Sequence, residues 1–136
     1  MAAEATSLPA WVRVWRDAIT PLATVEGLQR LLWALKKDDE RLIQGATTKP
    51  PPLRCVEDWE CEGACAIGFL GWEEGGTVGT VEEFFASTCY AIDQTLGEPA
   101  GCRHFICWTD ETPRTEMRRL LIPEVERSIQ LKVEKV

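Results

Sequence analysis

The chain has 136 residues, of which 45% are hydrophobic and 27% charged, and its formal net charge is −7 at pH 7. This length fits one domain with its own core, and the composition is that of an ordinary globular protein. No apolar run reaches membrane-spanning length, and the acidic balance argues against direct binding to nucleic acid or to an anionic membrane. We expect a disordered lead at 1–7 and a single helical domain over 8–136.

The acidic excess is confined to the middle of the chain. Residues 55–100 hold ten Asp or Glu and no Lys or Arg, whereas residues 1–54 hold eight basic and six acidic residues and residues 101–136 hold seven and six. Phosphate binding needs lysine and arginine, so the middle should repel nucleic acid and attract a basic protein instead. The alternative is that these acids serve solubility alone.

Cysteine usage and the first residues bear on the cellular compartment. The chain contains six cysteines, and the segment Met1–Glu4 has neither a basic region nor a long apolar run after it. We therefore expect no signal peptide, a cytoplasmic location and reduced thiols.

Two amphipathic helices are predicted in the first third of the chain. Ser7 can cap the first helix, Pro9 fits its first turn, and Thr20-Pro21 should end it. Thr24 can cap the second helix, which closes with Lys36-Lys37, where cations suit the helix dipole. The two apolar stripes consist of Trp11, Val14, Trp15, Ala18 and Ile19, and of Val25, Leu28, Leu31, Leu32 and Leu35.

A connector and a buried helix are predicted next. The segment 45–53 contains three consecutive prolines, which favour an extended loop. The apolar run Ala64–Leu70 is rich in small residues and shows no period-two alternation. This pattern predicts a buried helix over 58–70, with its acidic flanks in water. Gly75-Gly76 then provides a flexible break.

A long helix and a short extended segment are predicted after this break. Thr80 and Glu83 match a capping box, and Gly97 should end the helix that they begin. The aromatic and branched residues at 104–108 predict a short extended segment.

The last helix should begin near Thr112 or Thr115, and Pro123 should kink it or split it in two. Taken in order, these elements predict a mainly α protein. We expect a compact bundle of about five helices with one short extended segment near 104–108.

Three stretches resemble a known family. They are Cys65 to Leu70, the helix from Thr88 to Leu96, and Ile106 to Thr115, which holds the run Trp-Thr-Asp-Glu-Thr-Pro. They are similar to a family of small uncharacterised proteins common in actinobacteria and phages. That family has a Cys-x-x-Gly-x-Leu helix and a Trp-x-Asp-x-x-Pro turn before its last helix. The resemblance implies a small, mostly helical domain and implies no activity.

Cysteine, histidine and aspartate offer an enzymatic or a metal-binding alternative. Cys65, the single histidine His104 and Asp110 follow the order of thiol, imidazole and orienting acid found in cysteine hydrolases. A metal could be coordinated by the sulfur and nitrogen atoms of Cys61, Cys65 and His104, but no paired Cys-x2-Cys spacing supports a metal site. Because Cys65 lies in an apolar run, we predict buried thiols and no catalytic residue, metal or cofactor.

Two tryptophans mark a candidate binding surface. Trp59 and Trp72 bracket the central apolar run among acids, and tryptophan is enriched at interface hot spots. The leading hypothesis is a cytoplasmic, non-enzymatic interaction protein of a kind that phages or mobile elements encode. Its acidic face would dock on a basic partner, such as a nucleic-acid enzyme, and the sequence leaves its oligomeric state open. The candidate partner-binding residues are Trp59, Glu60, Glu62, Trp72, Glu73 and Glu74.

Overall fold

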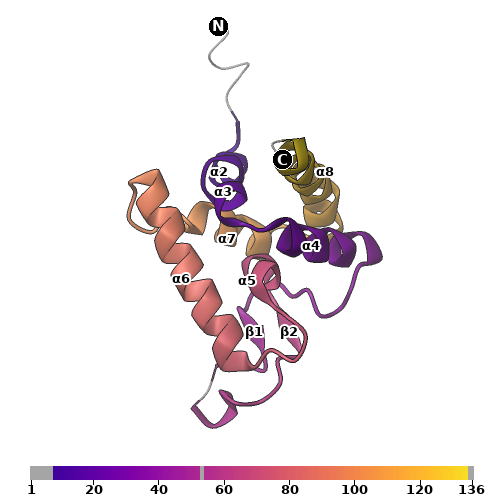
Figure 1. The fold of residues 1–136 in the computed structure, drawn as a ribbon, viewed down its shortest axis with the longest axis vertical. Coiled ribbons are helices and arrows are strands. Elements are labelled where there is room, and N and C mark those ends of the chain that lie inside the picture. Colours follow the sequence, from indigo (N-terminus) through magenta and orange to yellow (C-terminus); the bar gives the residue numbers. More distant parts are fainter. Residues whose placement is uncertain (1–7, 53, 135–136) are drawn as a thin grey trace, which may run out of the picture.

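Helices make up most of the chain in the computed structural model, which describes residues 8–52 and 54–134 (Figure 1). The predicted mainly α bundle is confirmed, and the predicted disordered lead at 1–7 lies outside the described residues. None of the described helices is both long enough and apolar enough to cross a membrane. The elements are α2 (Ala10–Val14), η1 (Trp15–Ile19), α3 (Thr20–Leu22), α4 (Val25–Lys37), β1 (Thr48–Lys49), η2 (Arg54–Val56), β2 (Gly63–Ala64), α5 (Ala66–Gly71), α6 (Val78–Leu96), α7 (Arg103–Glu111) and α8 (Arg114–Glu134).

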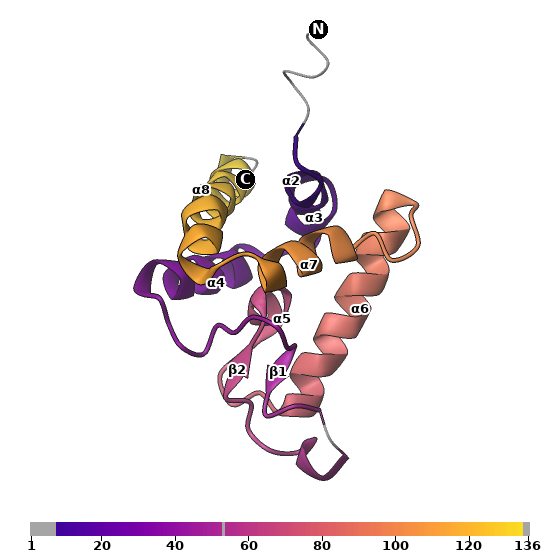
Figure 2. The same ribbon diagram turned by 180° about the vertical axis from the view of Figure 1, so that it is seen from behind.

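Helices α5 and α7 lie at the centre of the fold. In both views α6 lies on one side of them, and α4 and α8 lie on the other (Figures 1 and 2). The two short strands lie below α5 and pair antiparallel, with Thr48 opposite Ala64 and Lys49 opposite Gly63. The largest fully buried side chains are Trp15, Phe105, Ile19, Leu28, Leu31, Leu35, Leu42, Ile67, Ile92, Met117, Leu121 and Val78.

The first helix runs through the proline that was predicted to end it. α2, η1 and α3 follow one another without a break, and Thr20 keeps right-handed helical geometry before Pro21. We attribute this to the π-helical turn η1, whose wider hydrogen-bond spacing accommodates a residue with no N–H to donate. The helix ends two residues later, where Ala23 becomes extended.

The predicted buried helix over 58–70 is wrong in its first half. Gly63 and Ala64 form strand β2, and the helix α5 begins only at Ala66. Main-chain pairing explains the difference, because Glu62 N donates to Lys49 O at 2.7 Å and Ala64 N donates to Arg41 O at 2.8 Å. These bonds across the chain outweigh the helix propensity of the alanines.

The extended segment predicted at 104–108 is also wrong, because these residues lie in helix α7. The helix places Phe105 and Trp108 on one face, three residues apart. Trp108 stacks on Trp11 with ring centroids 3.7 Å apart and an interplanar angle of 5°. Burial of these rings against the N-terminal helix overrides the local preference for a strand.

Helix ends were predicted with mixed success. Thr24 caps α4 by accepting from Gly27 N at 3.0 Å, and Gly97 ends α6 in left-handed geometry, as expected. The capping box of α6 is formed by Thr77 and Thr80 and not by Thr80 and Glu83, so the helix begins earlier. α8 begins within the expected range, but Pro123 lies inside it and does not split it.

The indole of Trp15 is the main buried polar group of the core. Its N–H donates to Ser128 Oγ at 2.8 Å, and that hydroxyl lies 2.7 Å from Thr20 Oγ1 and donates to Glu124 O at 3.0 Å. One hydroxyl thus satisfies the N–H of a fully buried tryptophan and ties α8 to the first helix.

We expect Ser128→Ala to lower the free energy of unfolding by about 1–3 kcal/mol, because it leaves the buried indole N–H without its main partner. Urea unfolding followed by circular dichroism measures this. Ser87→Ala, on the exposed face of α6, is the matched control and should be neutral or slightly stabilising. Equal effects of the two substitutions would contradict the assigned role.

Gly27 gives a second prediction, because a Cβ at this helical position would collide with the main-chain oxygen of Leu70. An alanine inside a helix normally stabilises it by about 0.5–1 kcal/mol relative to glycine. Here we expect Gly27→Ala to destabilise the protein by about 1–3 kcal/mol, because α4 and α5 must move apart. A raised melting temperature would show that the two helices are not in close contact.

Candidate functional site

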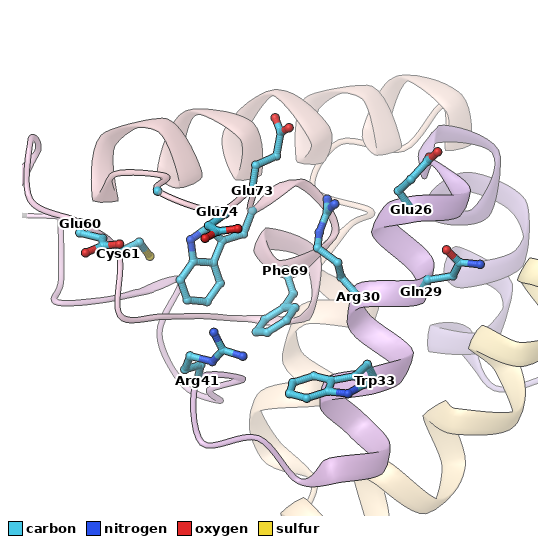
Figure 3. A pocket seen from close by; sticks show the side chains of 12 residues that line it. Glu26, Gln29, Arg30, Trp33, Arg41, Glu60, Cys61, Phe69, Glu73 and Glu74 are labelled. Carbon is cyan, nitrogen blue, oxygen red and sulfur yellow. The ribbon is translucent and has the colours of Figure 1, made fainter.

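An open groove lies beside α4 (Figure 3). It has a volume of about 800 Å³. It lies between α4, the turn after α4, the chain before β2, and the segment that follows α5. Its lining residues are Glu26, Gln29, Arg30, Trp33, Arg41, Glu60, Cys61, Phe69, Trp72, Glu73, Glu74 and Gly75.

One wall of the groove is a single face of α4. Glu26, Arg30 and Trp33 are spaced by four and three residues, which places them in one row along the helix. The opposite face of α4 is buried in the core through Leu28, Leu31 and Leu35. The Trp33 side of the helix therefore faces water, and the residue is 50% exposed.

The facing wall is built from the end of α5. Phe69 and Trp72 contact each other edge to face, with centroids 5.3 Å apart and an interplanar angle of 81°. Gly71 lies directly against the ring of Phe84 on α6, where no larger side chain would fit. This contact fixes the direction in which the chain leaves α5 and so places Trp72 at the groove.

The acidic rim depends on a turn and a main-chain pairing. Gly76 N donates to Glu73 O at 2.9 Å, and Gly75 has a positive φ of 81°, so the chain reverses after Glu74. Cys61 N then donates to Gly76 O at 2.9 Å, next to a β-bridge between Glu60 and Thr77. The carboxylate of Glu60 is thereby brought close to the turn that carries Glu73 and Glu74.

Arg41 lines the groove together with Trp33 and Trp72. Its guanidinium carbon lies over both rings, 5.9 Å from the centroid of Trp33 and 6.0 Å from that of Trp72. The guanidinium also donates hydrogen bonds to Asp39, from Nη2 to Oδ2 at 2.7 Å and from Nε to Oδ1 at 3.1 Å. These hydrogen bonds hold the pKa of Asp39 below its ordinary value.

Arg30 is the second cation of the groove. Its Nη2 donates to Leu70 O at 2.8 Å, which satisfies a carbonyl near the C-terminal end of α5. Its Nε is buried without a hydrogen-bond partner among the described residues. Both arginines are thus already engaged within the chain, Arg30 by a carbonyl and Arg41 by a carboxylate.

The structure brings together four of the six residues predicted to bind a partner. Glu60, Trp72, Glu73 and Glu74 line the groove. Trp59 is 56% exposed and Glu62 is also exposed, but neither belongs to the lining. The sequence analysis missed the α4 wall and Arg41. The one available signal was Trp33, which lies on the margin of the apolar stripe of α4.

The remaining acids of 55–100 do not extend this surface uniformly. Glu82 accepts from Thr48 Oγ1 at 2.7 Å, Asp93 accepts from Cys102 N at 2.9 Å, and Glu98 lies 2.8 Å from His104 Nε2. α6 has 19 residues and is therefore roughly 28 Å long. Asp93, near its far end, is well separated from Glu57, whose carbonyl accepts from Gly79 N near its start. The acidic middle is therefore several separate surfaces.

The residues of the enzymatic alternative have separate partners. Cys65 is buried, and burial raises the pKa of its thiol to about 11. His104 is exposed and bonds to Glu98, while Asp110 accepts from Gly45 N at 2.9 Å. No hydrogen bond joins the thiol, the imidazole and the acid within the described residues. Over the same residues, no three His, Cys, Asp or Glu side chains gather into a candidate metal site.

Comparisons with protein-family models, with curated proteins and with solved structures gave no match to this chain. The resemblance to a family of small actinobacterial and phage proteins therefore stays an expectation, and the site is interpreted from its own geometry.

The thiols give a prediction that separates structural from reactive cysteines. Cys55 is exposed, whereas Cys61, Cys65 and Cys102 are buried. Burial raises the pKa of each of these three thiols, so few thiolates are present near neutral pH. A thiol reagent at about pH 8 should label Cys55 first, and the Cys55→Ser protein should lose this fast phase. Labelling of Cys65 as fast as Cys55 would instead support a nucleophilic role.

Proposed function

We propose that this chain is a non-enzymatic interaction protein whose groove binds a basic segment of a partner protein. The observation that carries the proposal is a set of four carboxylates around an aromatic groove. None of them forms an ion pair with another described residue. The four are Glu26, Glu60, Glu73 and Glu74.

Charge complementarity supports a basic occupant. The groove lining contains four carboxylates and two arginines, and the charge of Arg41 is neutralised by its ion pair with Asp39. A cationic segment entering the groove would meet carboxylates that form no ion pair with another described residue. Such an arrangement speeds association and favours basic over acidic partners.

The aromatic residues supply the contact that charges alone do not. Trp33, Phe69 and Trp72 offer apolar surface in the groove, whose lining also holds the four carboxylates. Interfaces commonly combine an aromatic centre with a polar rim, and most of the binding energy comes from the centre. A groove of about 800 Å³ has room for a few side chains of a partner. The occupant we propose is therefore a short segment.

Proteins that bind nucleic acid carry basic segments of this kind, because they neutralise phosphates with lysine and arginine. We propose a partner of this class, with the groove carboxylates taking the place of phosphates. We also propose that the protein is cytoplasmic and is encoded by a phage or mobile element, as expected from the sequence.

A defined peptide tests the proposal. A fluorescent peptide of alternating basic and apolar residues should bind the protein at low salt, and an acidic peptide of the same length should not. The triple variant Glu60→Gln, Glu73→Gln, Glu74→Gln should weaken binding by about tenfold or more, if each exposed charge contributes about 0.5 kcal/mol. Fluorescence anisotropy measures the dissociation constants.

The matched control removes the same charge elsewhere. Glu57, Asp58 and Glu83 are exposed and do not line the groove. Their amide variants should weaken binding by less than about threefold, because these carboxylates do not line the groove and salt screens exposed charges that make no direct contact. Equal losses in the two triple variants would show diffuse attraction without a groove, and a basic peptide that fails to bind would remove the proposal.

A further inference from the structure

Arg41 is the more exposed of the two groove arginines. Two indoles and one carboxylate lie around its guanidinium, as the distances to Trp33, Trp72 and Asp39 show. Aromatic faces attract cations through their quadrupole, and a carboxylate binds a guanidinium through two parallel hydrogen bonds. This combination of groups would bind a cation from any source, including one that belongs to another protein.

We propose that Arg41 is an internal competitor, and that the groove takes an arginine side chain of the partner in the position that Arg41 now fills. This inference rests on the proposed function and specifies its ligand chemistry. It identifies a guanidinium, and not only positive charge, as the group that the groove recognises.

The main chain at Arg41 makes such an exchange feasible. Its carbonyl accepts from Ala64 N at 2.8 Å, and its own N–H donates to Asp39 Oδ1 at 2.9 Å, so the backbone is fixed. The Arg41 side chain is 53% exposed, whereas that of its partner Asp39 is 11% exposed. Arg41 can therefore turn outward into solvent, and a partner guanidinium that replaces it would keep the Asp39 carboxylate paired.

The shape of the position favours arginine over lysine. A guanidinium is planar, stacks on indole rings and binds a carboxylate with two donors, whereas an ammonium is a compact and strongly hydrated charge. Trp33, Trp72 and Asp39 address these features together. A partner lysine would keep its charge and its attraction to the rings but would lose the bidentate contact with Asp39.

Two substitutions at Arg41 test the competition. Arg41→Ala vacates the position, and Arg41→Lys keeps the charge but removes the planar group. The probes are two fluorescent peptides of identical length and charge, one with arginines and one with lysines at the same positions. We expect Arg41→Ala to tighten binding of the arginine peptide by about five- to tenfold and that of the lysine peptide by about twofold. Arg41→Lys should raise the preference for arginine by about threefold with net charge unchanged.

Lys37→Ala is the matched control for charge, because Lys37 is an exposed α4 cation that does not line the groove. It should strengthen both peptides equally, by about twofold, through reduced repulsion alone. Adding Asp39→Asn to Arg41→Ala should abolish the gained arginine preference, because the bidentate acceptor is lost. Melting curves of all variants verify that they are folded.

The outcomes separate this inference from the proposed function. One outcome is that the wild-type protein binds basic peptides through its groove acids while Arg41→Ala changes the affinity for both peptides equally or weakens it. In that case the proposed function stands, and Arg41 stabilises the groove and does not compete with the ligand. If neither peptide binds the wild-type protein or the Arg41→Ala protein, both proposals fail. A selective gain for the arginine peptide supports both.

Discussion

The close approach of α4 and α5 at Gly27 and Leu70 is the contact on which the rest of the site depends. Gly27 leaves no side chain between the helix and the carbonyl of Leu70, and Arg30, one turn further along α4, donates to the same oxygen. α5 is thereby held with its C-terminal end against α4. This position directs Trp72 toward Trp33, with Arg41 between them. Without this contact the two aromatic walls would have no fixed spacing.

α4 serves the fold and the site with opposite faces. Leu28, Leu31 and Leu35 are fully buried against the core, and the row through Arg30 and Trp33 lines the groove. Because the buried face sets the rotation of the helix about its axis, it also decides which side chains face α5. The apolar stripe could be predicted from the sequence. The groove face could not, since glutamate, glutamine and arginine are equally typical of a helix surface that contacts only water.

The central segment shows where sequence reasoning succeeds and where it stops. Its small residues permit close approaches, because Gly63 lies against Arg41 O and Gly71 against the Phe84 ring. The type of element was wrong before Ala66, because pairing of β2 with residues far away in sequence decides it. α7 repeats this lesson, since its aromatic residues favour a strand locally but are buried as a helix against Trp11. Local patterns identify burial more reliably than they identify the bonds that produce it.

The sequence correctly indicates an acidic excess in residues 55–100, but the prediction of one acidic face formed by all of them was too broad. The ten acids of 55–100 are spread over the chain before β2, the turn after α5, and α6 with the loop that follows it, and α6 alone is roughly 28 Å long. Salt screens exposed charges beyond about 8 Å. The partner proposed for the groove would therefore respond to the carboxylates that line it, together with Asp39 beside Arg41, and not to the formal charge of −7. Selectivity then depends on the groups that surround Arg41, because two indoles and a carboxylate distinguish one cation from another while scattered acids do not.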